Sequence, residues 1–81
     1  MQDRIRDVLA AHGRMEIDPQ EVDSHADLYE LGMTSLASVN VMLALEDVFG
    51  VEFPEEVVKK STFASVRNIE RVVEGLVKSS A

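Results

Sequence analysis

One serine stands where the sequence could support covalent chemistry. Ser35 lies three residues after Gly32, at the point where the pattern predicts the start of a helix. Free backbone N–H groups and the positive end of a helix dipole favour a phosphate ester at such a position. A serine at a helix start is also an ordinary capping residue, so this residue alone leaves a structural and a chemical interpretation open.

Other kinds of active site find no support in the sequence. Residues 32–36 read Gly-Met-Thr-Ser-Leu, which is not the Gly-x-Ser-x-Gly nucleophile elbow, and no relay partners accompany His12 or His25. The acidic loop lacks the carboxylate spacing of an EF-hand. The chain has no cysteine, so a thiolate metal site and a disulfide are both excluded. We therefore expect neither catalysis by the chain itself nor a metal site.

Hydrophobic periodicity predicts an all-α chain that begins with a helix over residues 2–12. Ile5, Val8 and Leu9 share one face of this helix, and Gly13 is placed to cap its C-terminal end. A connection over about residues 14–34 follows, and loops of this length are uncommon. It carries apolar residues that could pack against the fold, so we expect it to be ordered: Met15, Ile17, Val22, Leu28 and Leu31.

Three further helices are expected. The second begins at Thr34 or Ser35 and ends near Phe49, and a short third helix follows Pro54 because proline suits the first helical turn. The last helix follows Thr62, a good N-cap, and its apolar residues recur at steps of three and four: Phe63, Val66, Ile69, Val72, Val73 and Leu76. These segments predict a small four-helix bundle, three longer helices plus a short third one, in a single domain over residues 1–81.

The second helix has two apolar stripes where a surface helix needs one. At about 100° per residue, a broad arc forms the expected core face: Val41, Met42, Ala44, Leu45, Val48 and Phe49. A narrower stripe near Ser35 is flanked by polar and acidic residues. Either this stripe is also core, covered by the long connection, or it is an exposed partner-binding surface. The candidate partner-binding residues are Leu36, Val39, Asn40, Leu43, Glu46 and Asp47.

The charge distribution limits the possible partners. The net charge is −7, and no Lys or Arg occurs between Met15 and Val58, a span with eleven carboxylates. Such a surface repels nucleic acid and anionic membranes and attracts basic partner surfaces. No segment approaches the roughly 20 apolar residues of a membrane span, and no signal peptide is visible. We expect a cytoplasmic monomer that binds no nucleic acid and inserts in no membrane.

A stretch around Ser35 resembles a known motif. Residues 27–36 read Asp-Leu-Tyr-Glu-Leu-Gly-Met-Thr-Ser-Leu. This is similar to the phosphopantetheine attachment motif of acyl carrier proteins, which has an Asp-Leu pair, a glycine and a Ser-Leu pair at this spacing. The resemblance continues through residues 43–49 (Leu-Ala-Leu-Glu-Asp-Val-Phe), 51–54 (Val-Glu-Phe-Pro) and 61–63 (Ser-Thr-Phe).

The resemblance implies an acyl-carrier-like four-helix fold and a non-catalytic carrier. A phosphopantetheinyl transferase would attach 4'-phosphopantetheine from coenzyme A to Ser35. The thiol of that arm would hold an acyl or aminoacyl group as a thioester. A ligase or synthetase that loads the cargo and a downstream transferase that receives it would be the further partners.

Two departures from the family pattern indicate a specialised carrier. Fatty-acid carriers typically have aspartate before the serine, where this chain has Thr34. They also tend to have acidic residues in the first turns of the second helix, where Ala37, Ser38 and Asn40 stand here. The Thr-Ser-Leu version is similar to small carriers loaded by stand-alone, synthetase-like amino acid ligases. A general fatty-acid carrier and an unmodified acidic interaction module remain the alternatives.

Overall fold

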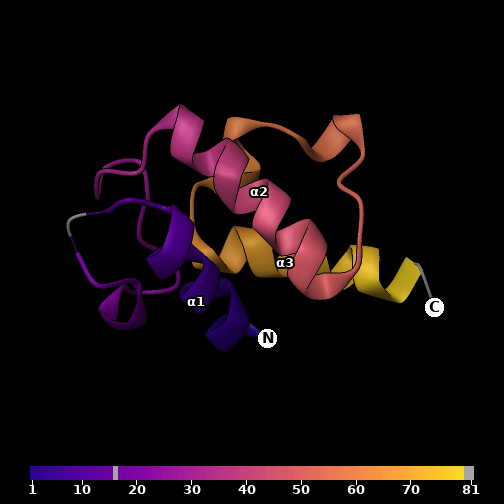
Figure 1. Ribbon diagram of the computed structural model, residues 1–81, viewed down its shortest axis with the longest axis horizontal. Helices are drawn as coiled ribbons and strands as arrows, with labels where there is room; N and C mark the ends of the chain where they lie inside the picture. Colours follow the sequence, from indigo (N-terminus) through magenta and orange to yellow (C-terminus); the bar gives the residue numbers. More distant parts are fainter. Residues whose placement is uncertain (16, 80–81) are drawn as a thin grey trace.

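A computed structural model describes residues 1–15 and 17–79, so Glu16, one of the eleven carboxylates, lies outside the described residues. Within these residues there is no β-strand, which confirms the all-α fold class, and each helix is too short or too polar to cross a lipid bilayer. The elements, shown in Figure 1, are α1 (Gln2–His12), η1 (Pro19–Glu21), α2 (Ser35–Phe49), η2 (Glu55–Val57), η3 (Lys60–Phe63) and α3 (Val66–Ser79), where η denotes a 3-10 helix.

The core lies where the three α-helices meet, and each contributes fully buried apolar side chains. They are Ile5 and Leu9 of α1, Val41 and Leu45 of α2, and Val66, Ile69 and Val73 of α3. Two residues that were expected to be buried are exposed. Val48 is 42% exposed and Ile17 is 45% exposed. The buried arc of α2 instead extends toward its N-terminal end, where Ala37 and Ser38 are buried.

The prediction of a short third helix of the bundle after Pro54 is wrong, because this segment is a 3-10 turn. The turn, η2, ends at Val57, and the next residue, Val58, has a non-helical backbone (φ −84°, ψ 82°). The Thr62 hydroxyl donates to the Val57 carbonyl at 2.6 Å and so holds the segment between η2 and η3. Thr62 is therefore not the N-cap of α3. Ser65 takes that place, because its Oγ accepts from the Asn68 N–H at 3.1 Å.

The long connection between α1 and α2 is tied to both ends of the fold. The Arg6 guanidinium, from α1, donates to the Pro19 and Val22 carbonyls at 2.8 and 2.5 Å. Further along, the Leu28 N–H donates to the Ala64 carbonyl, just before α3, at 2.7 Å. These bonds and the burial of Val22 and Leu28 hold residues 17–34 of this connection against the helices.

The turn at the start of the connection requires glycine at position 13. Gly13 follows α1 and donates its N–H to the Leu9 carbonyl at 2.7 Å. It has right-handed helical φ and ψ, so a left-handed backbone is not the reason for its use. A Cβ at this position would lie 2.7 Å from the Leu9 oxygen, which only glycine avoids. The left-handed residue is the next one, Arg14, with φ 54°.

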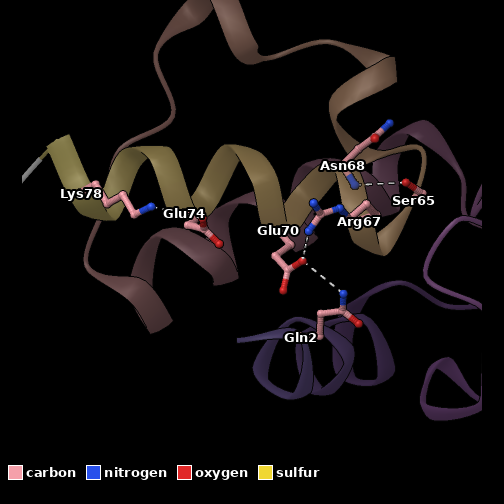
Figure 2. A network of polar contacts seen from close by, with 7 residues as sticks. All are labelled: Gln2, Ser65, Arg67, Asn68, Glu70, Glu74 and Lys78. Carbon is pink, nitrogen blue, oxygen red and sulfur yellow. Dashed lines mark hydrogen bonds and ion pairs between the residues drawn. The ribbon is translucent and has the colours of Figure 1, made fainter.

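A polar contact joins α1 to α3, as Figure 2 shows. The Glu70 carboxylate accepts from the Gln2 side chain at 3.1 Å and from the Arg67 guanidinium at 2.7 Å. The Gln2 hydrogen bond, and then that of Arg67, hold the pKa of Glu70 below its ordinary value of 4.5, although partial burial opposes them. The ionised form of Glu70 therefore favours the folded state.

The lowered pKa of Glu70 gives a pH-dependent prediction. Its contribution is complete above the unfolded-state pKa and is lost as the pH falls through the lower folded-state value. We expect wild type to have a larger free energy of unfolding than Glu70→Gln at about pH 7, with the gap closing below about pH 4.5. Urea titrations over a pH series measure this. The control, Glu74→Gln, removes an exposed pair with Lys78 and should change little. A gap that is constant with pH would contradict the prediction.

Candidate functional site

The segment before α2 is built to deliver Ser35 to the surface. The Asp27 carboxylate accepts from the Tyr29 N–H at 2.9 Å, which starts a compact turn. Leu28 is fully buried and anchors this turn, and its carbonyl accepts from the Met33 N–H at 3.1 Å. Gly32 has φ 111°, a backbone conformation that favours glycine. The Asp-Leu pair and the glycine of the motif are thus structural residues that set the position of Ser35.

Thr34, not Ser35, caps the helix. Its Oγ1 accepts from the Ala37 N–H at 3.0 Å, and its carbonyl accepts from the Ser38 N–H at 2.9 Å. Ser35 is the first residue of α2, is exposed, and has a hydroxyl with no hydrogen bond to any residue that the structure describes. Because a neighbour supplies the cap, the Ser35 hydroxyl is free to react.

The other serine of the first turns is already in use. Ser38 is only 7% exposed, and its hydroxyl donates to the Ser35 carbonyl at 2.7 Å. It therefore supports the backbone of Ser35 and is unavailable to a partner enzyme. His12 and His25 are exposed, and no group of three or more His, Cys, Asp or Glu in residues 1–15 and 17–79 could hold a metal ion.

A groove of about 220 Å³ lies beside Ser35, between α2 and the segment that leads through η3 to α3. In Figure 1 this segment arches across the top of the view to reach the N-terminal end of α2. The α2 side of the groove includes Ser35, Val39 and Met42, and the opposite side includes Lys59 and Lys60. These lysines are not among the site residues expected from the sequence. The available signal was their position directly after the long span without basic residues.

The narrow stripe of α2 is exposed, so the long connection does not cover it. Leu36, Val39 and Leu43 are 74%, 47% and 51% exposed, although apolar side chains of this size are usually buried. Asn40 and Asp47 on its flank are exposed as well. The structure thus places five of the six candidate partner-binding residues on one accessible side of α2, which runs from the end that bears Ser35 to Asp47 near the other end.

Glu46, the sixth candidate, has a structural contact. Its carboxylate accepts from the backbone N–H of Phe53 at 2.9 Å, and its backbone carbonyl accepts from Val51 N–H at 3.2 Å. The side chain is partly buried and ties the end of α2 to the segment that follows Gly50. Gly50 is left-handed, with φ 64°, and allows the chain to reverse there. Asp47 is therefore the freer of the two carboxylates.

These features fit an arm joined through a phosphodiester. The ester would be at the first turn of α2, where helix N–H groups lack partners within the helix and the dipole favours negative charge. The serine hydroxyl is exposed and unpaired, and the groove beside it gives the first atoms of an arm a place to lie. Because the chain contains no thiol of its own, the arm would provide the only one.

Comparison with known proteins gives consistent matches. A family model described as "Phosphopantetheine attachment site" matches residues 3–73. The aminoacyl carrier protein of Agrobacterium fabrum is 39% identical over 69 residues, which are 85% of this chain and 83% of that protein.

Two solved structures show the same architecture. One is the complex of an engineered Bradyrhizobium japonicum glycine:[carrier protein] ligase with a carrier protein from Agrobacterium tumefaciens and AMP. The match has a TM-score of 0.89 and 38% identity, and it covers 91% of this chain and 99% of that chain. The other is the B. japonicum ligase complexed with glycylated carrier protein, with a TM-score of 0.75, 28% identity, and coverage of 88% and 95%.

The cap at Thr34 can be tested independently of any modification. Thr34→Ala removes the acceptor for the Ala37 N–H and should lower the free energy of unfolding by about 1 kcal/mol. Thr34→Asp keeps an acceptor at this position and should remain close to wild type. Urea denaturation followed by circular dichroism compares the three proteins. Equal stability of Thr34→Ala and wild type would show that this hydrogen bond does not stabilise α2.

Proposed function

Because the chain belongs to the phosphopantetheine attachment-site family, we propose that it is a carrier protein for aminoacyl groups, with Ser35 as its attachment site. Members of this family carry 4'-phosphopantetheine. Residues 1–81 would act as a single carrier domain. The chain's own part is to present the arm and its cargo, while partner enzymes perform the bond-making steps.

The observation that carries this proposal is the free hydroxyl of Ser35 at the capped start of α2. A phosphopantetheinyl transferase would join Ser35 Oγ to the phosphorus that bears the pantetheine arm in coenzyme A. The pyrophosphate bond of coenzyme A breaks in this step, and its nucleotide half leaves. Once attached, the arm supplies the thiol that holds the cargo as a thioester. Thr34 and the Ser38–Ser35 hydrogen bond keep the attachment point fixed on the helix.

The aminoacyl cargo is supported by the relatives and by the surface beside Ser35. The Agrobacterium relative is an aminoacyl carrier protein, and the two solved complexes pair carrier proteins with a glycine:[carrier protein] ligase. Of the three positions in the first turns of α2 where fatty-acid carriers tend to have acids, Asn40 is exposed in this chain, and Ala37 and Ser38 are buried and uncharged. Glycine, loaded by a stand-alone ligase and passed to a downstream transferase, is therefore the cargo we would test first.

The docking surface for the loading ligase would be the exposed stripe of α2. An enzyme that reaches the thiol of the arm approaches the end of α2 that bears Ser35. Leu36, Val39 and Leu43 offer it apolar contact area, and Asp47 adds a charge at the edge. The apolar contacts would act mainly on the dissociation rate, and the exposed charge on the association rate at low salt.

The attachment site is tested by intact-mass spectrometry. Wild type treated with coenzyme A and a promiscuous phosphopantetheinyl transferase should gain the mass of one arm, and Ser35→Ala should gain none. The helical circular-dichroism signal of Ser35→Ala should stay close to wild type, because the Ser35 hydroxyl makes no hydrogen bond to the described residues. Thr34 remains as the cap in both proteins. An unmodified wild type would favour the alternative, an acidic interaction module. Modification of Ser35→Ala would assign the site elsewhere.

The docking surface is tested by loading kinetics. Leu43→Asp in the holo protein should lower kcat/KM for loading by a glycine:[carrier protein] ligase by about tenfold or more, since a charge would be placed in an apolar contact. Val48→Asp is the matched control, because Val48 is 42% exposed on the same helix but lies beside α1. Circular dichroism checks that both variants are folded. Equal loading of the two variants would contradict a docking role for Leu43.

A further inference from the structure

Two lysine side chains line the groove beside Ser35, and the proposed carrier function does not yet assign them a role. Lys59 and Lys60 lie across it from Ser35, although the sequence separates them from that residue by more than twenty positions. They are the first basic residues after the acidic span that ends at Val58. The fold therefore brings positive charge to the one point of this acidic chain where a further negative charge would be attached.

The ammonium group of Lys60 already has a defined place. Its Nζ lies 5.0 Å from the centroid of the Tyr29 ring, a separation at which cation and ring attract each other. Tyr29 belongs to the turn that delivers Ser35, and it lines the same groove. This contact holds the cation near the start of α2 without neutralising it.

Neither lysine is paired with a carboxylate of residues 1–15 or 17–79. In the part of the chain that the structure describes, the ion pairs join Arg67 to Glu70 and Lys78 to Glu74. Both charges of the groove thus remain available to an anion. Lys59 also lines a second groove with Arg71, on the side of α3, so positive charge continues away from Ser35 along this face.

We infer that Lys59 and Lys60 are positioning residues for the phosphodiester on Ser35. Modification adds a negative charge to a chain whose net charge is already −7. The lysines offset this added repulsion and draw the phosphodiester toward the groove, which leaves Leu36 and Leu43 of the exposed stripe uncovered. This inference rests on the proposed attachment at Ser35, and it adds which residues hold the phosphate.

A thermodynamic cycle between modification and charge tests this inference. Three proteins are compared in apo and holo form: wild type, Lys59→Gln/Lys60→Gln, and Arg4→Gln/Lys78→Gln. The last has the same net charge as the groove variant, but its two changes are on exposed residues of α1 and α3 that do not line the groove. The measured quantity is the melting temperature of the holo form minus that of the apo form. Losing the Lys60–Tyr29 contact affects both forms equally and cancels.

We expect the holo-minus-apo difference to fall by about 1–5 °C in the groove variant relative to wild type, the range for exposed charge pairs in a domain of this size. The control should keep the wild-type difference. High salt should reduce the effect. Amide NMR spectra should show signals of residues 59 and 60 shifting on modification.

Two results overturn the inference even when the mass spectrum shows full modification. One is an equal holo-minus-apo difference in wild type and in the groove variant. The other is an equal loss in the groove variant and in the control, which would show an effect of net charge alone. An unmodified wild type is a different outcome, because it removes the attachment at Ser35 and this inference together.

Discussion

The hydrogen bond from the Leu28 N–H to the Ala64 carbonyl, 2.7 Å long, joins the two segments on which the site depends. Leu28 is fully buried and anchors the turn that leads to Ser35. Ala64 follows η3, the element that carries Lys60. With this bond in place, the start of α2 and the lysine-bearing segment form the two sides of one groove. A small domain buries little surface in its core, so a hydrogen bond between segments distant in the sequence makes a larger relative contribution to holding those segments together.

The polar side chains around α2 divide into those that stabilise the fold and those that remain free. Thr34 caps the helix, Ser38 bonds the Ser35 carbonyl, and Glu46 bonds the Phe53 N–H. Ser35 and Asp47 are exposed at the two ends of the same helix. This division explains how one short helix can have both a hydrogen-bonded, capped backbone and an accessible surface. The groups that fix the backbone are neighbours of the groups that partners would contact, but they are different residues.

The replacement of aspartate by Thr34 fits this division. Both residues can cap a helix, because each offers a side-chain oxygen to a first-turn N–H. Threonine supplies the cap without placing a charge beside the proposed phosphodiester. A carrier with this residue keeps the geometry of the proposed attachment site and presents a less acidic surface there. Having Thr34 in place of aspartate would then favour partners that bind through apolar contacts over partners that recognise charge, while the fold stays intact.

The sequence by itself determined the all-α class, a helix start at Thr34 or Ser35 and two of the three α-helices nearly to their ends, because those signals are local. Periodic apolar residues and the motif around Ser35 act over a few turns of chain. The sequence predicted Thr62 as the cap of α3, and this was wrong: the Thr62 hydroxyl bonds the Val57 carbonyl, and Ser65 caps the helix. The sequence could not decide whether the stripe containing Leu36 is covered, or show that Lys59 and Lys60 stand beside Ser35. Those depend on which segments pack against α2, and contacts between residues far apart in the chain exist only in the tertiary structure.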